Sequence, residues 1–194
     1  DFVDQAIKGQ IEINKKGEKA VIENNSIIEH PLASLTKMMT CLLVLEKIEE
    51  GKLNLEDETK ISYQASIIRG SRLNLKRGEK ISVKDLLKGV IVYSGNNAAY
   101  ALAELVAGTE ADFVNLMNEK AQKLDMKNTL YYTSTGLPSS MTGKKLDIST
   151  AQDLVKLTIE ILKYKTYLEY SKLKDVTIKG KKYKNRNNLL NQYL

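Results

Sequence analysis

Cysteine and histidine are almost absent from this chain of 194 residues, since each occurs only once. The single cysteine, Cys41, excludes a disulfide within the chain, and its place in an apolar run predicts a small buried residue. Zinc sites built from several clustered cysteines and histidines are excluded for the same reason. The single histidine, His30, would have to serve any Ser-His-Asp triad. It stands between Glu29 and Pro31 in a segment typical of a loop, so we do not expect such a triad.

Long apolar runs are also missing, because no stretch approaches the roughly 20 apolar residues that a membrane-spanning helix needs. Residues 1–4 have neither the basic start nor the apolar core of a secretory signal peptide. This pattern fits a cytosolic protein or an exported protein that has already been processed. We find no internal repeat, no zinc spacing and no aromatic RNA-binding motif, so nucleic acid is not an expected partner. A length of 194 residues suits one domain, or one domain with a small lobe.

Positive charge is in excess, with a net charge of +6 and an isoelectric point near 9.1. A basic surface favours nucleic acid, anionic membranes or anionic polymers. The excess gathers late in the chain, and we interpret that segment as a solvated hairpin, with contact to an anionic polymer as the alternative. Its cations are Lys172, Lys174, Lys179, Lys181, Lys182, Lys184 and Arg186.

The apolar periodicity predicts an α+β fold with strands near both chain ends and a central block of helices. We expect strands at 6–13 and 19–22, short strand-like pieces at 59–61 and 72–75, and a late hairpin at 175–178 and 181–183. Residues 129–148 are typical of a long surface loop. The terminal strands are expected to share an antiparallel sheet that the helices cover. Helices are expected at 33–50, 83–92, 98–106 and 166–171, from Thr109 to about 124, and from Ser149 to about 164.

Capping residues mark several of these helix starts. Ser82 and Thr109 each precede an acidic residue at the third helical position. Ser149 precedes Gln152 and Asp153 in the same way, and Asn96 or Asn97 is a candidate cap for the helix at 98–106.

Ser34 and Lys37 open an apolar run and place a hydroxyl and an amine three residues apart. On a helix, such positions are neighbours on one face. A serine becomes a nucleophile when a base accepts its proton, and a lysine can be that base where desolvation lowers its pKa. The start of a helix also supplies free N–H groups and a positive dipole end for a developing anion. The plainer interpretation is a helix start with a surface lysine.

Ser94-Gly95-Asn96 follows 60 residues later at a junction between two expected helices. It supplies a second hydroxyl, which can relay protons, and a carboxamide, which can hold a substrate amide. The plainer interpretation is a turn. Taken together, the two motifs favour an acyl-transfer enzyme with a serine nucleophile.

Both motifs, and many segments between them, resemble the low-molecular-mass penicillin-binding proteins, and more narrowly the serine-type D-alanyl-D-alanine carboxypeptidases. Ser-x-x-Lys is a known signature of penicillin-binding proteins and β-lactamases. Asn97 stands where the family commonly has aspartate. The resemblance runs from about residue 6 to residue 190, and its matching segments are 31–40, 70–75, 78–79, 94–99, 103–104, 113, 117–118, 121, 128–129, 136–137 and 149–154.

The resemblance implies a β-lactamase/transpeptidase-like fold and a reaction without metal or organic cofactor. Ser34 would attack the carbonyl between two D-alanines and form an acyl-enzyme. Lys37 would accept the Ser34 proton, and Ser94 would relay a proton to the leaving amine. Asn96 would hold the Lys37 side chain or the substrate amide. The substrate would be a peptidoglycan stem peptide ending in D-Ala-D-Ala, bound by Ser34, Ser94 and Asn96, and penicillins would acylate Ser34.

One part of the family pattern is missing, because the sequence contains no Lys-Thr-Gly motif. Lys165-Thr166-Tyr167 lies in a helical context and does not match. The family carries the motif shortly after a segment like 185–190, so we expect residues 1–194 to be a single catalytic domain that is incomplete at its C-terminus. Such a chain would be inactive alone or would need the motif from another polypeptide.

The substrate implies an extracytoplasmic place in the bacterial cell envelope, with membrane association through a segment absent from this chain. Two rival functions stay open. A class A-like β-lactamase shares the fold and the first motif, but we find no segment in 129–148 that matches its deacylating glutamate. A non-catalytic peptidoglycan-binding or scaffold protein would keep the fold without the chemistry.

Overall fold

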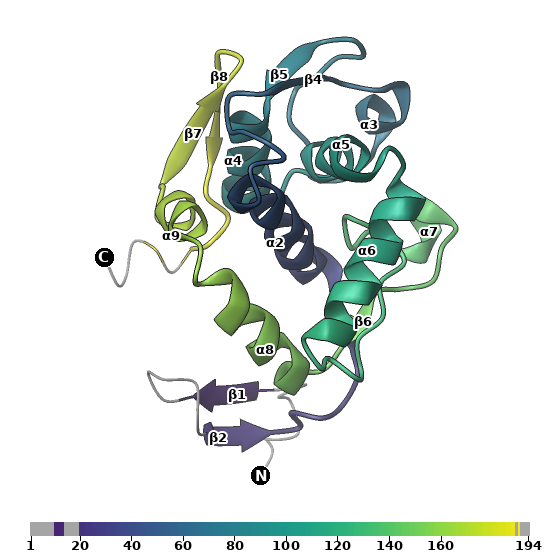
Figure 1. Ribbon diagram of the computed structural model, residues 1–194, viewed down its shortest axis with the longest axis vertical. Helices are drawn as coiled ribbons and strands as arrows, with labels where there is room; N and C mark the ends of the chain where they lie inside the picture. The colour runs from purple at the N-terminus through teal and green to yellow at the C-terminus, as the bar shows by residue number, and fades with distance from the viewer. Residues whose placement is uncertain (1–9, 14–19, 189, 191–194) are drawn as a thin grey trace.

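The computed structural model describes residues 10–13, 20–188 and 190. The first described elements are β1 (Gln10–Ile13) and β2 (Ala20–Asn24), which pair antiparallel. Residues 6–9 and 19, which the sequence also assigns to strands, lie outside the described residues. β1 packs against the later helix α8 (Ala151–Ile161), and Figure 1 shows both at the same end of the molecule.

The long helix predicted after Pro31 lies at the centre of the molecule (Figure 1). It begins as a 3₁₀ turn, η1 (Ala33–Leu35), and continues as α2 (Thr36–Glu49). Gly51, with a φ of 68°, follows the C-cap residue Glu50, and its left-handed backbone ends the helix. Cys41 is 1% exposed, which confirms its predicted burial. Helices on several sides cover α2, so the residues at its start are held by the core of the protein.

Three of the covering helices follow in sequence: α4 (Val83–Tyr93), α5 (Asn96–Ala107) and α6 (Glu110–Lys123). The capping predictions for α4 and α6 are confirmed, because Ser82 Oγ accepts from the Asp85 N–H and Thr109 Oγ1 accepts from the Asp112 N–H. Before α4, the short helix α3 (Tyr63–Ile67) lies between β4 (Glu58–Lys60) and β5 (Lys80–Ser82), which pair antiparallel.

Two capping predictions are wrong. The N-cap of α5 is Gly95, without a side-chain cap, because both asparagine amides are engaged elsewhere: Asn96 with the Arg69 carbonyl and Asn97 with Leu73. At α8, the cap is Thr150, one residue after the predicted serine. Ser149 is instead the last residue of β6 (Ile148–Ser149).

The segment from 129 to 148 is not the surface loop that the sequence predicts. It contains the short helix α7 (Ser139–Thr142), and its two ends run inward. β6 pairs antiparallel with β3 (His30–Pro31), so the end of the segment joins the residues just before α2. Polar side chains of this segment are therefore buried beside the start of α2; Thr133, Ser134, Thr135 and Asp147 are each at most 3% exposed.

The chain ends in α9 (Lys165–Ser171) and the predicted hairpin, β7 (Asp175–Ile178) with β8 (Lys181–Lys184). The α+β class is confirmed, but the described strands form separate two-stranded sheets. β7 and β8 pack on α4, whereas β1 packs on α8, so the early and late strands lie on different helices. The predicted strand at 72–75 is also wrong, since Asn97 holds that backbone instead. No described helix is long and apolar enough to cross a membrane.

Candidate active site

Ser34 and Lys37 face each other where η1 passes into α2. The Lys37 ammonium donates to Ser34 Oγ at 3.2 Å and to the Thr135 carbonyl at 2.7 Å. Only 4% of Lys37 is exposed. This burial lowers the pKa of Lys37 from 10.5 to about 8, and the positive charge of Arg186 acts in the same direction, while Asp147 opposes it. The amine can therefore lose its proton at a pH where an exposed lysine stays charged.

Ser94 reaches the same point from the junction of α4 and α5. Its backbone is left-handed, with a φ of 60°, and so turns the side chain out of the helix. Ser94 Oγ donates to Ser34 Oγ at 3.0 Å. Ser34 Oγ thus has an amine on one side and a second hydroxyl on the other, which is an arrangement able to take and return a proton.

Asn96 lies in the same cavity but is turned away from the lysine. Its Nδ2 donates to the Arg69 carbonyl at 2.9 Å, and among the described residues no hydrogen bond joins it to Lys37. Gly70 makes room for this amide, since a Cβ at position 70 would lie 2.7 Å from Asn96 Nδ2. The resemblance implies two roles for Asn96, holding Lys37 or contacting the substrate amide. This geometry favours the second role over the first.

A cavity of about 460 Å³ opens over Ser34 and Ser94. Such a volume suits a short peptide segment or a small molecule. The cavity also borders Arg186, which follows β8 and donates from Nη1 to Ser71 Oγ at 2.6 Å. Its other walls are Ala33, Gly70, Ser71, Asn96, Thr135, Gly136, Leu137 and Pro138.

Gly136 fixes how closely the 133–136 segment approaches the nucleophile. Its φ is 75°, and a Cβ there would lie 1.7 Å from the Ala33 carbonyl oxygen. Ala33 itself has a φ of 46°, which is uncommon for a residue with a side chain. The turn that presents Ser34 therefore packs directly against a backbone that only glycine can provide.

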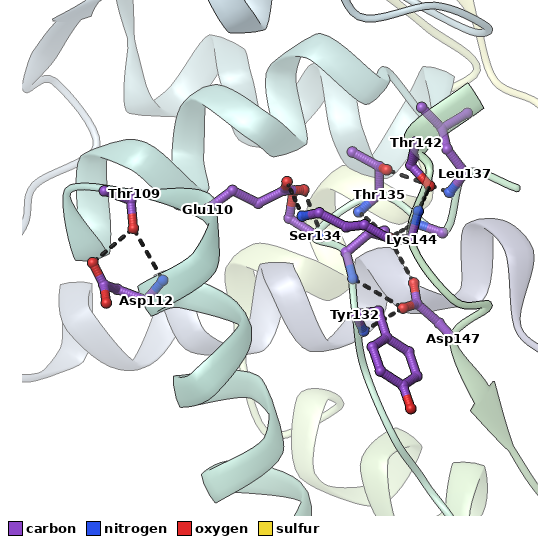
Figure 2. A network of polar contacts seen from close by, with 12 residues as sticks. Thr109, Glu110, Asp112, Tyr132, Ser134, Thr135, Leu137, Thr142, Lys144 and Asp147 are labelled. Carbon is purple, nitrogen blue, oxygen red and sulfur yellow. Dashed lines mark hydrogen bonds and ion pairs between the residues drawn. The ribbon is translucent and has the colours of Figure 1, made fainter. Parts of the chain in front are cut away.

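Asp147 holds these two segments together and was not singled out from the sequence. Its Oδ2 accepts from Thr36 Oγ1 at 2.9 Å and from Thr133 Oγ1 at 2.7 Å. Its Oδ1 accepts from the N–H groups of Tyr132 and Thr133. Figure 2 shows the carboxylate directed at the backbone of the 132–135 segment. A buried carboxylate with four donors ties Thr36, next to Lys37, to the 132–135 segment, whose Thr135 carbonyl accepts from Lys37.

An ion pair supports the same segment farther from Ser34. Glu110 Oε1 accepts from the N–H and the hydroxyl of Ser134, and Glu110 Oε2 pairs with Lys144 at 2.7 Å (Figure 2). Asp147 and Thr135 had no recognisable sequence signal, because each acts through a neighbour brought close by the fold. Arg186 was singled out only as one of the late cations, and not as part of the site. The Gly-Leu dipeptide at 136–137 was the only hint, since the resemblance included it.

Most of this chain is similar in sequence to known proteins. The sequence family described as D-alanyl-D-alanine carboxypeptidase matches residues 4–194. The D-alanyl-D-alanine carboxypeptidase DacF of Bacillus subtilis is 35% identical over 84% of this chain. The match covers 41% of that relative, so the chain spans about two fifths of its length.

Solved structures show the same similarity. Penicillin-binding protein 6B from Escherichia coli has a TM-score of 0.82 and 32% identity, covering 89% of this chain and 55% of its own. Penicillin-binding protein D2 from Listeria monocytogenes, in its ampicillin-bound form, has a TM-score of 0.82 and 29% identity. That match covers 94% of this chain and 73% of the other.

Proposed function

This chain belongs to the D-alanyl-D-alanine carboxypeptidase family, and from that premise we propose that it carries the serine acylation centre of such an enzyme. The observation that carries the proposal is the contact of Ser34 Oγ with both Lys37 Nζ and Ser94 Oγ. The substrate is a peptidoglycan stem peptide ending in D-Ala-D-Ala. The product is the same peptide shortened by one D-alanine.

The first step forms a bond between Ser34 Oγ and the carbonyl carbon of the penultimate D-alanine. Lys37, neutral after losing its proton, accepts the hydroxyl proton of Ser34. The backbone N–H of Ser34, at the positive end of the helix, is the donor that we expect to face the developing oxyanion. The lowered pKa of Lys37, about 8, supports this role because a base works best near the operating pH.

The second step breaks the peptide bond to the terminal D-alanine. Ser94 donates its hydroxyl proton to the leaving nitrogen and takes the proton held by Lys37, so D-alanine leaves as a neutral amine. Water then attacks the ester carbon, with Lys37 again taking a proton, and Ser34 is restored. Two of the protein groups that exchange protons already touch the nucleophile, since Lys37 Nζ lies 3.2 Å and Ser94 Oγ 3.0 Å from Ser34 Oγ.

Two wall residues complete the substrate site in this proposal. Asn96 presents its carboxamide to the peptide, and its contact with the Arg69 carbonyl keeps that amide in place. Arg186 is a guanidinium at the edge of the cavity, where it can attract the C-terminal carboxylate of the substrate. Penicillins carry a carboxylate beside a strained amide, so they are expected to acylate Ser34 through the same contacts.

The place of action follows from the substrate. Peptidoglycan lies outside the cytoplasmic membrane, so the proposal locates the protein in the bacterial cell envelope. Membrane association, if the whole protein has it, is proposed to come from a segment outside residues 1–194.

Release of D-alanine from a synthetic peptide ending in L-Lys-D-Ala-D-Ala tests the proposal. It should be measured for this chain, for a form extended to the length of the carboxypeptidase relatives, and for Ser34→Ala in each. We expect release that is lost in the Ser34→Ala protein. Rapid turnover of benzylpenicillin without D-alanine release would favour a β-lactamase, and peptide binding without either reaction would favour a non-catalytic scaffold.

A further inference from the structure

The whole net charge of the chain resides in one short segment. Residues 172–186 contain six lysines, one arginine and a single acidic residue, Asp175, for a net charge of +6. The chain as a whole also has a net charge of +6. The other 179 residues therefore balance, with 23 basic and 23 acidic side chains. The excess positive charge is therefore concentrated on the β7–β8 hairpin and its flanks and is not distributed over the surface.

The hairpin turns these lysines outward because its apolar residues alternate with them. Val176, Ile178 and Tyr183 are at most 6% exposed and anchor the hairpin where it packs on α4. Lys182 and Lys184 occupy the opposite face of β8, and Lys179 lies in the turn. All six lysines of the segment are exposed, and Figure 1 shows the hairpin at the edge of the molecule.

The face lacks the features that two other anionic partners would require. Single-stranded nucleic acid is bound by aromatic side chains on which bases stack, but Tyr183 is buried under the hairpin. Membrane-surface segments insert apolar side chains among their lysines, whereas Val176 and Ile178 point into the core. What is left is an array of compact point charges, which suits phosphate groups spaced along a flexible, non-aromatic chain.

The hairpin is also connected to the wall of the active-site cavity. Tyr183 Oη accepts from the Asn74 N–H at 2.7 Å, and Arg186, two residues beyond β8, donates to Ser71 Oγ. The Arg186 N–H donates to the Val92 carbonyl near the end of α4. A polymer bound along the hairpin therefore lies beside the mouth of the cavity that holds Ser34.

We propose that the β7–β8 hairpin is a docking surface for a phosphate-bearing linear polymer of the cell envelope, which holds the protein against its peptidoglycan substrate. The inference rests on the proposed function for the identity of the compartment. Its physical basis is a face with six exposed lysines and no exposed aromatic or apolar anchor, whose one acidic residue, Asp175, pairs with Lys182 at 3.0 Å. That basis does not depend on the proposed function.

Binding of long-chain inorganic polyphosphate tests the surface directly. The variant is Lys179→Gln/Lys182→Gln/Lys184→Gln. The control, Lys52→Gln/Lys127→Gln/Lys163→Gln, removes the same charge from lysines that are at least 63% exposed and lie outside residues 172–186. We expect the hairpin variant to lose at least about tenfold in affinity at low salt, and its slope of log K against log salt to fall by about 2. The control should change affinity less than about twofold.

Purified cell walls extend the test to the envelope polymer. The protein should sediment with walls that keep their phosphodiester-linked polymer and should be released after hydrofluoric acid removes it. Equal losses in the two triple variants would overturn the proposal, as would tighter binding to oligothymidylate or to phosphatidylglycerol vesicles than to polyphosphate. Acylation by benzylpenicillin should be unchanged in both variants, so a failure of the proposed function would appear separately, as no acylation in any form.

Discussion

At the scale of single residues, the chemistry depends on one buried amine. Lys37 is 4% exposed and touches the nucleophile, and its pKa of about 8 is set mainly by burial. Below that pH the amine is protonated and cannot accept the Ser34 proton. Because the shift is downward, the active form of the base increases as the pH rises through about 8.

Acylation by benzylpenicillin should follow this titration. We expect the second-order rate constant to rise about tenfold per pH unit below the pKa and to level off above it. The rate should be measured between pH 6 and pH 10, with unfolding checked at each end. A rate independent of pH across the midpoint would contradict Lys37 as the base. In Lys37→Ala, the rate should fall by about 10²- to 10⁴-fold while the fold is retained.

Asp147 is expected to act as a positioning residue. Asp147→Asn removes the charge from four hydrogen bonds that join Thr36 to the 132–133 backbone. We expect the free energy of unfolding to fall by about 1–3 kcal/mol and the acylation rate to fall with it.

Asp125→Asn is the matched control, since that carboxylate is 68% exposed and pairs with Lys127 at the surface. Its free energy of unfolding should change by less than about 0.5 kcal/mol. If Asp147→Asn is less stable but, while folded, acylates at the normal rate, then Asp147 stabilises the fold and does not position the catalytic residues. Measuring denaturant unfolding and acylation on the same samples separates the two results.

At the scale of elements, the site is built where η1 and α2 meet the 133–136 segment. The close contact of the 133–136 segment with Ala33 requires a glycine at position 136. Gly143 is a suitable comparison, because it has a similar φ of 69° but open space around it. Gly143→Ala should cost about 1–2 kcal/mol for its left-handed backbone alone. Gly136→Ala adds a collision with the Ala33 carbonyl, so its free energy of unfolding should fall by several kcal/mol more. Acylation activity should be lost as well.

Thermal unfolding of the two glycine variants checks this prediction. Equal losses of stability in both would show that the close approach of Gly136 to Ala33 is relaxed in solution.

Local sequence patterns predict some of these elements and not others. The start of α2 and the Ser34–Lys37 pair were predictable, because helical spacing alone brings positions i and i+3 together. Ser94 was predictable as a junction residue but not as a neighbour of Ser34. The 129–148 segment was misread as a surface loop, because nothing local indicates that Asp147 finds four donors in the core. The cap of α5 was misread because its asparagines serve the 69–73 backbone instead.

At the scale of the whole molecule, the early and late strands do not share a ladder among the described residues. The apolar periodicity predicts an α+β protein, and that is correct, but strand pairing between distant segments leaves no periodic signal in a sequence. The concentration of net charge on one hairpin is likewise visible in the sequence, whereas its position beside the Ser34 cavity is a property of the fold.

The central claim is that Ser34 is the nucleophile of an acyl-enzyme. Intact-mass measurement after incubation with benzylpenicillin, with Ser34→Ala beside it, tests this most directly. The account predicts one stoichiometric adduct of the mass of benzylpenicillin, absent from the Ser34→Ala protein. An adduct that persists in Ser34→Ala, or no adduct on folded protein of either the present or the extended length, would contradict it.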